Sequence, residues 1–292
     1  MLNIWRQSLC LILVPALLSP ALADAEPLDD AASDPNTMGW MRGFPPPDER
    51  IIGHPASDYF SFPKLRWTFC HFREIQATKR VGRGIGPVSP LSGVLDPAID
   101  DVTFMPIGSD EEMTWKASLD ANYTDGMLIL HRGEIVYEYY SGCLDREGRH
   151  GAMSVTKSFV GTIAEILIAE GELDDSKLVS DYVPELKSSA FGNATVRQVM
   201  DMTTGLDYNE NYADPESDIW QYAAAGDPAP KPESYAGPRN FYEFLHGVEP
   251  EGAHGDAFIY KSINTDALAW VIARATGKDF NDHLADRIWK PL

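Results

Sequence analysis

The stretch MSVTKSFVGTIAEILIAEGELD, residues 153–174, decides the fold. Its apolar residues recur at the three- and four-residue spacing of a helix that buries one face. These residues are Phe159, Val160, Ile163, Ile166 and Leu167. Gly171 follows as a natural stop, because glycine adopts the left-handed conformation that ends many helices. The pattern predicts a mostly buried helix that begins at Ser154.

Ser154 and Lys157 lie three residues apart at the start of this predicted helix. Residues at that spacing share a face, so the two side chains can meet. Partial burial and the positive end of the helix dipole would lower the pKa of the lysine, and its neutral amine could accept the serine proton. In the alternative interpretation, Ser154 only caps the helix and Lys157 points to solvent. A second Ser-x-x-Lys, Ser61 to Lys64, contains a proline and is interpreted as a chance match.

Further elements follow from local patterns. Residues 126–142, GMLILHRGEIVYEYYSG, predict a β-hairpin that turns at His131-Arg132-Gly133. Thr195 and Gln198 form a capping box that opens a helix, for which Gly205 is the expected stop. Residues 257–263, AFIYKSI, predict a short extended piece, and residues 264–277, NTDALAWVIARATG, predict a helix closed by its final glycine.

Composition limits the possible functions. The chain of 292 residues carries 44 Asp and Glu against 24 Lys and Arg, and this acidic balance argues against nucleic acid or a membrane surface as a partner. No histidine spacing typical of a metal site occurs, and no metal or cofactor is expected. Residues 1–23 have the pattern of a secretory signal peptide, which predicts a secreted or periplasmic protein without a membrane anchor. Cys70 and Cys143 could form a disulfide there or remain as two buried thiols.

The order of these segments resembles the serine β-lactamase-like superfamily. The segments are EYYSG, SVTKSF, EGELD, VSDYVPEL, TVRQVMDMTTGL and FIYKSINTDALAWVIARATG. The resemblance covers about residues 100–292 and is strongest to the branch with class C β-lactamases, esterases and 6-aminohexanoate-dimer hydrolase. It implies an α+β fold, in which helices flank an antiparallel sheet beside a mostly helical region. It also implies Ser154 as the acylated nucleophile and Lys157 as its proton acceptor.

The family's second motif is usually Tyr-x-Asn, and the matching stretch here is Tyr260-Lys261-Ser262. The resemblance implies that Tyr260 protonates the leaving group and later activates water; the alternative is a core aromatic residue on a strand. Ser262 replaces the asparagine and offers only one hydroxyl, a departure that favours the nylon-oligomer hydrolase branch over a β-lactamase. In that branch an aromatic lid follows the Met-Thr-x-Gly turn, and Tyr212 lies nearest that position. Ser262 and Tyr212 are therefore the expected substrate-binding residues.

Acidic residues surround Tyr212 in the loop 207–227. They are Asp214, Glu216, Asp218 and Asp227. A lid of this charge would favour neutral or amine-bearing substrates over the carboxylate of penicillins. In the alternative interpretation these side chains form a solvated loop face.

The family's third motif, Lys-Thr-Gly or His-x-Gly on a late strand, is not found in the chain, which ends at Leu292. We therefore expect a fragment or a truncated product that lacks the last strands of the sheet and the second oxyanion donor. The predicted organisation is a signal peptide (1–23), an irregular N-terminal extension with aromatic plugs (24–100) and an incomplete hydrolase domain (101–292).

Two classes of function remain open from the sequence. The first is a secreted serine hydrolase that cleaves a small amide or ester through an acyl-enzyme on Ser154, with a penicillin-recognising enzyme as the alternative: a class C β-lactamase or a D-alanyl-D-alanine carboxypeptidase. The second is a noncatalytic binding or sensing member of the same fold. The sequence does not indicate an oligomeric state.

Overall fold

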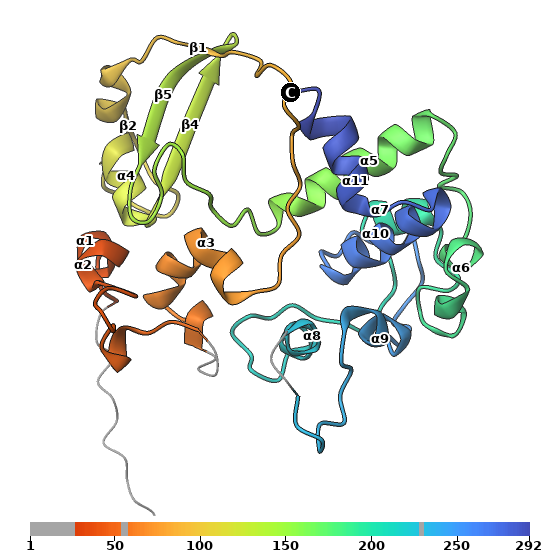
Figure 1. Ribbon diagram of the computed structural model, residues 1–292. Helices are drawn as coiled ribbons and strands as arrows, with labels where there is room; N and C mark the ends of the chain where they lie inside the picture. Colours follow the sequence, from red (N-terminus) through yellow and green to blue (C-terminus); the bar gives the residue numbers. More distant parts are fainter. Residues whose placement is uncertain (1–26, 54–57, 228–230) are drawn as a thin grey trace, which may run out of the picture.

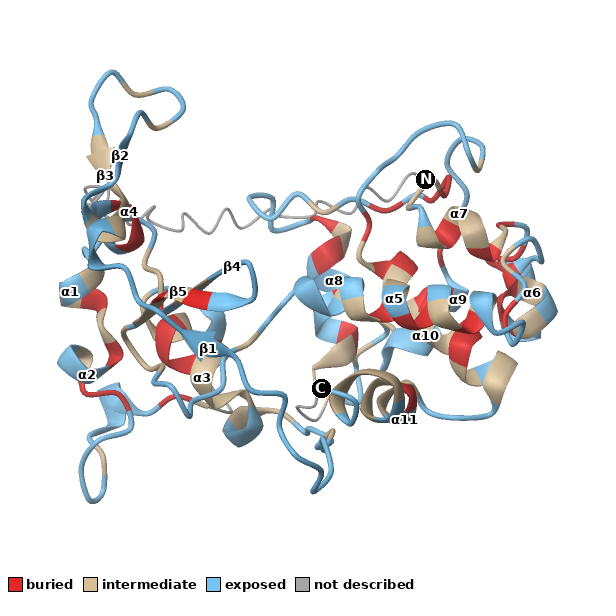
Figure 2. Ribbon diagram, turned by 90° about the horizontal axis from the view of Figure 1, so that it is seen from above, coloured by how far each residue is buried: buried red, intermediate tan, exposed pale blue. Residues whose placement is uncertain are grey.

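The computed structural model describes residues 27–53, 58–227 and 231–292. The predicted signal peptide lies outside these residues. The described elements form two lobes: one holds the strands and the first helices, and the other holds the helices that follow residue 154 (Figures 1 and 2). This mixture of helices and small sheets is the α+β architecture predicted from the sequence.

The strand lobe is built around a three-stranded sheet of order β1-β5-β4. The strands are β1 (Ser92–Gly93), β2 (Thr103–Phe104), β3 (Met113–Thr114), β4 (Gly126–His131) and β5 (Glu134–Tyr140). β4 and β5 pair as the predicted antiparallel hairpin, and both turn residues, Arg132 and Gly133, have the positive φ angles that tight hairpins require. β1 pairs with β5 in parallel over two residues, so the predicted antiparallel sheet also carries one short parallel strand. β2 and β3 form a separate antiparallel pair.

The helices are short except for three, α3, α5 and α10. The α-helices are α1 (Asp30–Ser33), α2 (Pro35–Met38), α3 (Lys64–Ile75), α4 (Trp115–Ala121), α5 (Val155–Ala169), α6 (Val179–Tyr182), α7 (Val196–Met200), α8 (Asp218–Gly226), α9 (Phe241–His246), α10 (Ile263–Thr276) and α11 (Phe280–Leu284). Shorter turns are η1 (Asp48–Arg50), η2 (Asp58–Phe60), η3 (Pro97–Asp101), η4 (Pro184–Ser188) and the π-helical η5 (Ala285–Trp289).

The main hydrophobic core lies in the helical lobe, where α10 packs against both α5 and α7. Ile163 and Leu167 of α5 and Ile272 of α10 are completely buried, and each such side chain contributes about 1.5–3 kcal/mol by leaving water. Figure 2 shows buried residues along both helices. The periodicity that predicted α5 thus corresponds to a real buried face.

Predicted helix ends are confirmed at two glycines and wrong at a third. Gly171 and Gly277 follow α5 and α10 with φ angles of +76° and +68°. The Thr195 capping box opens α7 as predicted, but α7 ends at Met200 rather than at Gly205. Gly205 instead allows a close backbone approach, since a Cβ there would lie 2.7 Å from the carbonyl oxygen of Glu251.

The N-terminal region is more regular than the sequence predicts. α3 runs for 12 residues within the segment expected to be irregular. Three aromatic residues, Trp40, Tyr59 and Trp67, form a small core there together with Ile52. Cys70 of α3 and Cys143 after β5 form a disulfide, so of the two alternatives left open the bonded pair is the one observed. Within the described residues, no helix is long and apolar enough to span a membrane.

Candidate active site

Ser154 is the residue that precedes the first turn of α5, and its side chain is exposed. Its hydroxyl makes no capping hydrogen bond with the helix. The preceding residue, Met153, has a φ angle of +44°, a strained value for a residue with a side chain. Residues in such conformations cluster at functional sites. The strained backbone before Ser154, together with the missing cap hydrogen bond, therefore favours a catalytic role for this serine over a helix-capping role.

Lys157 lies one helical turn from Ser154, and its Nζ is 3.0 Å from Ser154 Oγ. The lysine is half-buried rather than extended into solvent. The alternative in which Ser154 caps the helix and Lys157 points away is therefore wrong. The second Ser-x-x-Lys has a different arrangement, because Lys64 forms an ion pair with Asp58 at 2.6 Å.

Tyr260 is the third member of this group. Lys157 Nζ lies 5.1 Å from the centre of the Tyr260 ring, and the side chain is partly exposed. Burial alone would raise the pKa of the Tyr260 phenol, but hydrogen bonding to Ser154 and Lys157 and the lysine charge lower it overall. A phenol with a lowered pKa is better suited to move a proton than a core tyrosine would be.

The segment that carries Tyr260 is irregular backbone rather than a strand. The Ile259 N–H donates to the carbonyl oxygen of Met202 at 3.0 Å. Lys261, whose side chain is buried, donates to the carbonyl oxygen of Leu206, and burial lowers the pKa of this lysine. These contacts attach the Tyr260 segment to the chain that follows α7, and so they place the phenol beside the start of α5.

The two expected substrate-binding residues are joined by a residue that the sequence did not single out. Glu210 accepts hydrogen bonds from the Ser262 N–H, from the Ser262 hydroxyl at 3.1 Å and from the Tyr212 hydroxyl at 3.2 Å. Tyr212 and Ser262 thus lie together beside Tyr260. Glu210 also acts on Tyr260 electrostatically, in the direction that raises the pKa of the phenol.

Two of the four acidic residues predicted to charge the lid have local roles. Asp214 accepts the N–H of Glu216 at 3.0 Å, and Asp218 accepts both the backbone and the side-chain N–H of Asn209. Such bonds are typical of carboxylates that stabilise a loop. The carboxylate of Glu210, which the prediction did not name, carries the same sign of charge and acts on Tyr260.

A second carboxylate, Asp266 in the first turn of α10, was also missed. Its carboxyl group is buried and accepts a hydrogen bond from the Tyr222 hydroxyl of α8. Burial raises the pKa of Asp266, while Tyr222 and the charge of Lys157 oppose this rise. Asp266 therefore links α8 to the site, because it accepts a hydrogen bond from Tyr222 and its charge interacts with that of Lys157.

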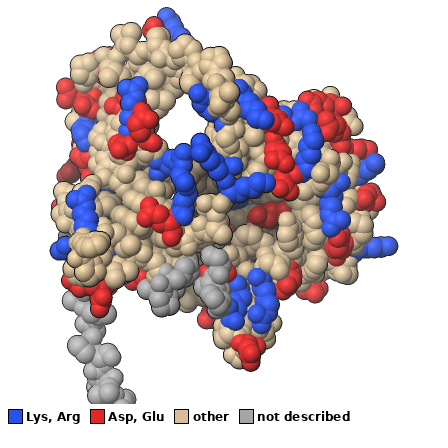
Figure 3. Space-filling model, in the orientation of Figure 1, with Lys and Arg blue, Asp and Glu red and all other residues tan. Residues whose placement is uncertain are grey.

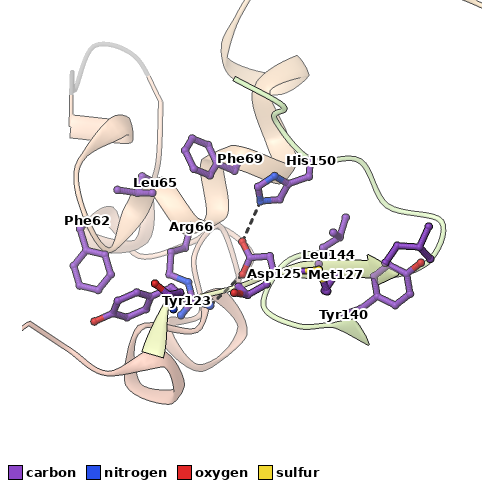
Figure 4. Close-up of a pocket in the computed structure, with 14 residues that line it drawn as sticks. Phe62, Leu65, Arg66, Phe69, Tyr123, Asp125, Met127, Tyr140, Leu144 and His150 are labelled. Carbon is purple, nitrogen blue, oxygen red and sulfur yellow. Dashed lines mark hydrogen bonds and ion pairs between the residues drawn. The ribbon is translucent and has the colours of Figure 1, made fainter. Parts of the chain in front are cut away.

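The chain that enters α5 is anchored by a charge network in which Asp125 and Arg66 are buried (Figure 4). Asp125, before β4, contacts Arg66 of α3 and His150, each at 3.1 Å. Beside it, the Gly151 N–H donates to the carbonyl oxygen of Phe69 at 2.7 Å. A side chain at Gly151 would collide with the ring of Phe72, so only glycine allows this approach. Residues 150 and 151 are thereby fixed just before Ser154.

Arg66, Asp125 and His150 line one hollow, and His150 also lines a second one. One, of about 650 Å³, is mainly apolar and aromatic. The other, of about 1260 Å³, is basic, with Arg73, Arg80, Arg83 and Arg149 in its lining. Figure 3 shows Lys and Arg side chains gathered beside a hollow on this face of the molecule. The excess of acidic residues is therefore not spread evenly over the surface.

Comparison with known proteins assigns the family. The family model described as Beta-lactamase matches residues 121–292, more than half of the chain. The chain belongs to the Beta-lactamase family. The 6-aminohexanoate-dimer hydrolase of Paenarthrobacter ureafaciens is 35% identical over 250 residues, which are 82% of this chain and 58% of that relative. A β-lactamase of Providencia stuartii is 45% identical over 53 residues, 18% of this chain and 14% of that protein.

This chain is also similar to a solved structure from Bacillus anthracis, which is provisionally assigned as a 6-aminohexanoate-dimer hydrolase. Its TM-score is 0.71 at 30% identity, over 79% of this chain and 60% of that chain. This similarity confirms the predicted β-lactamase-like α+β fold. The chain spans about three fifths of the length of the Paenarthrobacter and Bacillus relatives, 58% and 60%.

Proposed function

We propose that this protein is a secreted serine hydrolase that cleaves amide or ester bonds through an acyl-enzyme on Ser154. The observation that carries the proposal is the 3.0 Å distance between Ser154 Oγ and Lys157 Nζ, with Tyr260 beside the lysine. A nucleophile within hydrogen-bond reach of a base, with a second proton-transfer group nearby, is the arrangement that acyl transfer needs.

The proposed reaction has two halves. Lys157 accepts the Ser154 proton as Oγ attacks the substrate carbonyl, and Tyr260 donates a proton to the leaving amine or alcohol. In the second half Tyr260 takes a proton from water, whose oxygen attacks the acyl carbon, and Lys157 returns its proton to Ser154 Oγ as the ester bond breaks and the acid leaves. The backbone N–H of Ser154 at the start of α5 supplies one oxyanion donor, because the first N–H groups of a helix have no partner within the helix.

For substrate, we propose short-chain acyl esters and linear amides in preference to penicillins and cephalosporins. The names of the two similar hydrolases support this, and so does the Glu210 carboxylate between Tyr212 and Ser262. A fixed negative charge beside the site would repel a substrate carboxylate more than a neutral or amine-bearing group. Secretion is proposed from the signal-like residues 1–23 together with the Cys70–Cys143 disulfide, which is typical of oxidising compartments.

The test is acylation with p-nitrophenyl butyrate, followed by mass spectrometry of the quenched protein and by p-nitrophenol release. Wild type should gain one butyryl group on Ser154 and turn it over, whereas Ser154→Ala should gain none and remain folded. Labelling without release would indicate a sensing or trapping member of the fold, and the absence of labelling would contradict the proposal. Efficient penicillin turnover with little esterase activity would favour the β-lactamase alternative.

A further inference from the structure

Lys261 carries a buried amino group that the proposed reaction does not use. The residue is 3% exposed, whereas its neighbour Tyr260 is 42% exposed, so the two side chains point to opposite sides of their segment. Burial of an ammonium group is unfavourable unless hydrogen bonds and opposite charges compensate it. A methionine would fill the same space without this penalty. The amino group is therefore expected to contribute more than packing.

The amino group joins two segments that are far apart in the chain. It donates a hydrogen bond to the carbonyl oxygen of Leu206, 55 residues earlier. On the other side of Tyr260, the Ile259 N–H donates to the carbonyl oxygen of Met202 at 3.0 Å. The Tyr260 backbone is thus held between two bonds to the chain that follows α7, and one of the two depends on the Lys261 side chain.

The start of α10 is held by a different set of bonds. The Thr204 hydroxyl donates to Asn264 Oδ1 at 2.8 Å, and the Asn264 side-chain N–H donates to the carbonyl oxygen of Lys261 at 3.2 Å. Thr204 and Asn264 are both buried. Neither bond involves the Lys261 amino group. Its loss should therefore free the Tyr260 side of the segment while α10 stays in place.

We propose that Lys261 is a positioning residue that holds the Tyr260 phenol where it can protonate a leaving amine, and that it thereby favours the cleavage of amides. This inference rests on the proposed function. When an amide acylates Ser154, the Tyr260 proton passes to the amide nitrogen as the C–N bond breaks, and the acyl group remains on Ser154. A p-nitrophenolate leaves as a stable anion and needs no proton. A displaced phenol therefore slows the amide reaction selectively.

The test compares a butyryl p-nitroanilide with p-nitrophenyl butyrate, which form the same acyl-enzyme. Because kcat/KM reports the steps up to acylation, the shared second half of the reaction does not enter the comparison. Lys261→Met keeps the length of the side chain but removes the amino group. Misplacement of a catalytic group by about 1 Å can cost on the order of 100-fold, so kcat/KM for the anilide should fall about 10- to 100-fold, and that for the ester by less than about threefold. Equal losses on both substrates would overturn the inference.

Two further variants separate positioning from a general loss of stability. Leu167→Ala is the matched control, because it removes a fully buried side chain of α5 and should leave the anilide-to-ester ratio unchanged. Lys261→Cys can be alkylated with 2-bromoethylamine in urea without reductant and then refolded, which rebuilds an amine at the length of lysine. The ratio should return toward that of wild type treated in the same way. A changed ratio in Leu167→Ala, or an amine that does not restore the ratio, would contradict the proposal.

Hydrogen exchange gives a readout that does not require turnover. Lys261→Met should speed exchange of the Ile259 N–H, which forms the other bond beside Tyr260, whereas exchange within α10 should stay slow. Unchanged exchange at Ile259 would refute the attachment even in an active enzyme. If wild type hydrolyses neither substrate, the proposed function fails, and this exchange result alone then decides whether Lys261 holds the Tyr260 segment.

Discussion

Replacement of Asp125 by Asn should destabilise the protein, because this carboxylate is buried between two basic side chains. Its side chain is 6% exposed and lies 3.1 Å from Arg66, which is itself only 3% exposed. Loss of one partner of a buried ion pair costs about 3–5 kcal/mol, since the other charge remains out of water. Arg66 keeps a second partner, Asp30, at 2.8 Å, so we expect the lower end, about 3 kcal/mol.

The assay is equilibrium unfolding in urea near pH 6, where His150 is charged. The matched control is Asp120→Asn, which removes a carboxylate that is 48% exposed and pairs with Lys116 on the surface of α4. Such pairs contribute no more than about 0.5 kcal/mol. If Asp125→Asn lost no more free energy of unfolding than the control, the reasoning that the buried network anchors the chain before Ser154 would be refuted.

The same network predicts how stability depends on pH. The Asp125 carboxylate raises the pKa of His150 through their hydrogen bond, and burial only partly opposes this. A raised folded pKa contributes stability that is complete below the unfolded value, about 6.5, and is lost as pH rises through the folded value. Unfolding free energy should therefore fall above about pH 6.5 in wild type. This fall should be absent in Asp125→Asn, and its persistence there would assign it to another group.

Three further predictions concern the base, the crosslink and the core. Lys157→Arg should lower kcat for butyrate ester hydrolysis by about as much as Lys157→Ala, on the order of 100-fold or more, because a guanidinium cannot accept the serine proton; retained activity in the Arg variant would make the lysine merely structural. The Cys70→Ser/Cys143→Ser double variant should lose up to about 4 kcal/mol of unfolding free energy, because the disulfide closes a loop with a sequence separation of 73; an unchanged urea midpoint would contradict this. Leu167→Ala should cost about 3–5 kcal/mol in the same assay, since the side chain is fully buried in the helical core.

Local signals explain which elements could be predicted. α5 and α10 carry a helical apolar period and a glycine at the C-terminal end, and the hairpin carries a two-residue turn, so their existence follows from short stretches of sequence. α3 has no comparable signal. Its sequence KLRWTFCHFREI mixes aromatic and charged residues, and the helix is kinked at His71. It is stabilised by contacts distant in sequence, among them the disulfide to Cys143, which no local pattern encodes.

The candidate site divides in the same way. The meeting of Ser154 and Lys157 follows from helix geometry alone, and it was predictable from their spacing. Their approach to Tyr260 depends on bonds between the Tyr260 segment and the chain after α7, at Met202 and Leu206, so only the resemblance to a family could suggest it.

Glu210 shows why the sequence alone could not indicate which carboxylate of the lid loop acts on the site. The loop 207–227 contains several carboxylates that are alike in composition, and the prediction named four of them but not this one. What distinguishes Glu210 is its partner, because its donors at Ser262 belong to a helix 52 residues further along the chain. Asp214 finds its donor two residues away and therefore stabilises only the loop. A carboxylate acts on a site when its hydrogen bonds connect separate elements there, and this property exists only in the folded chain.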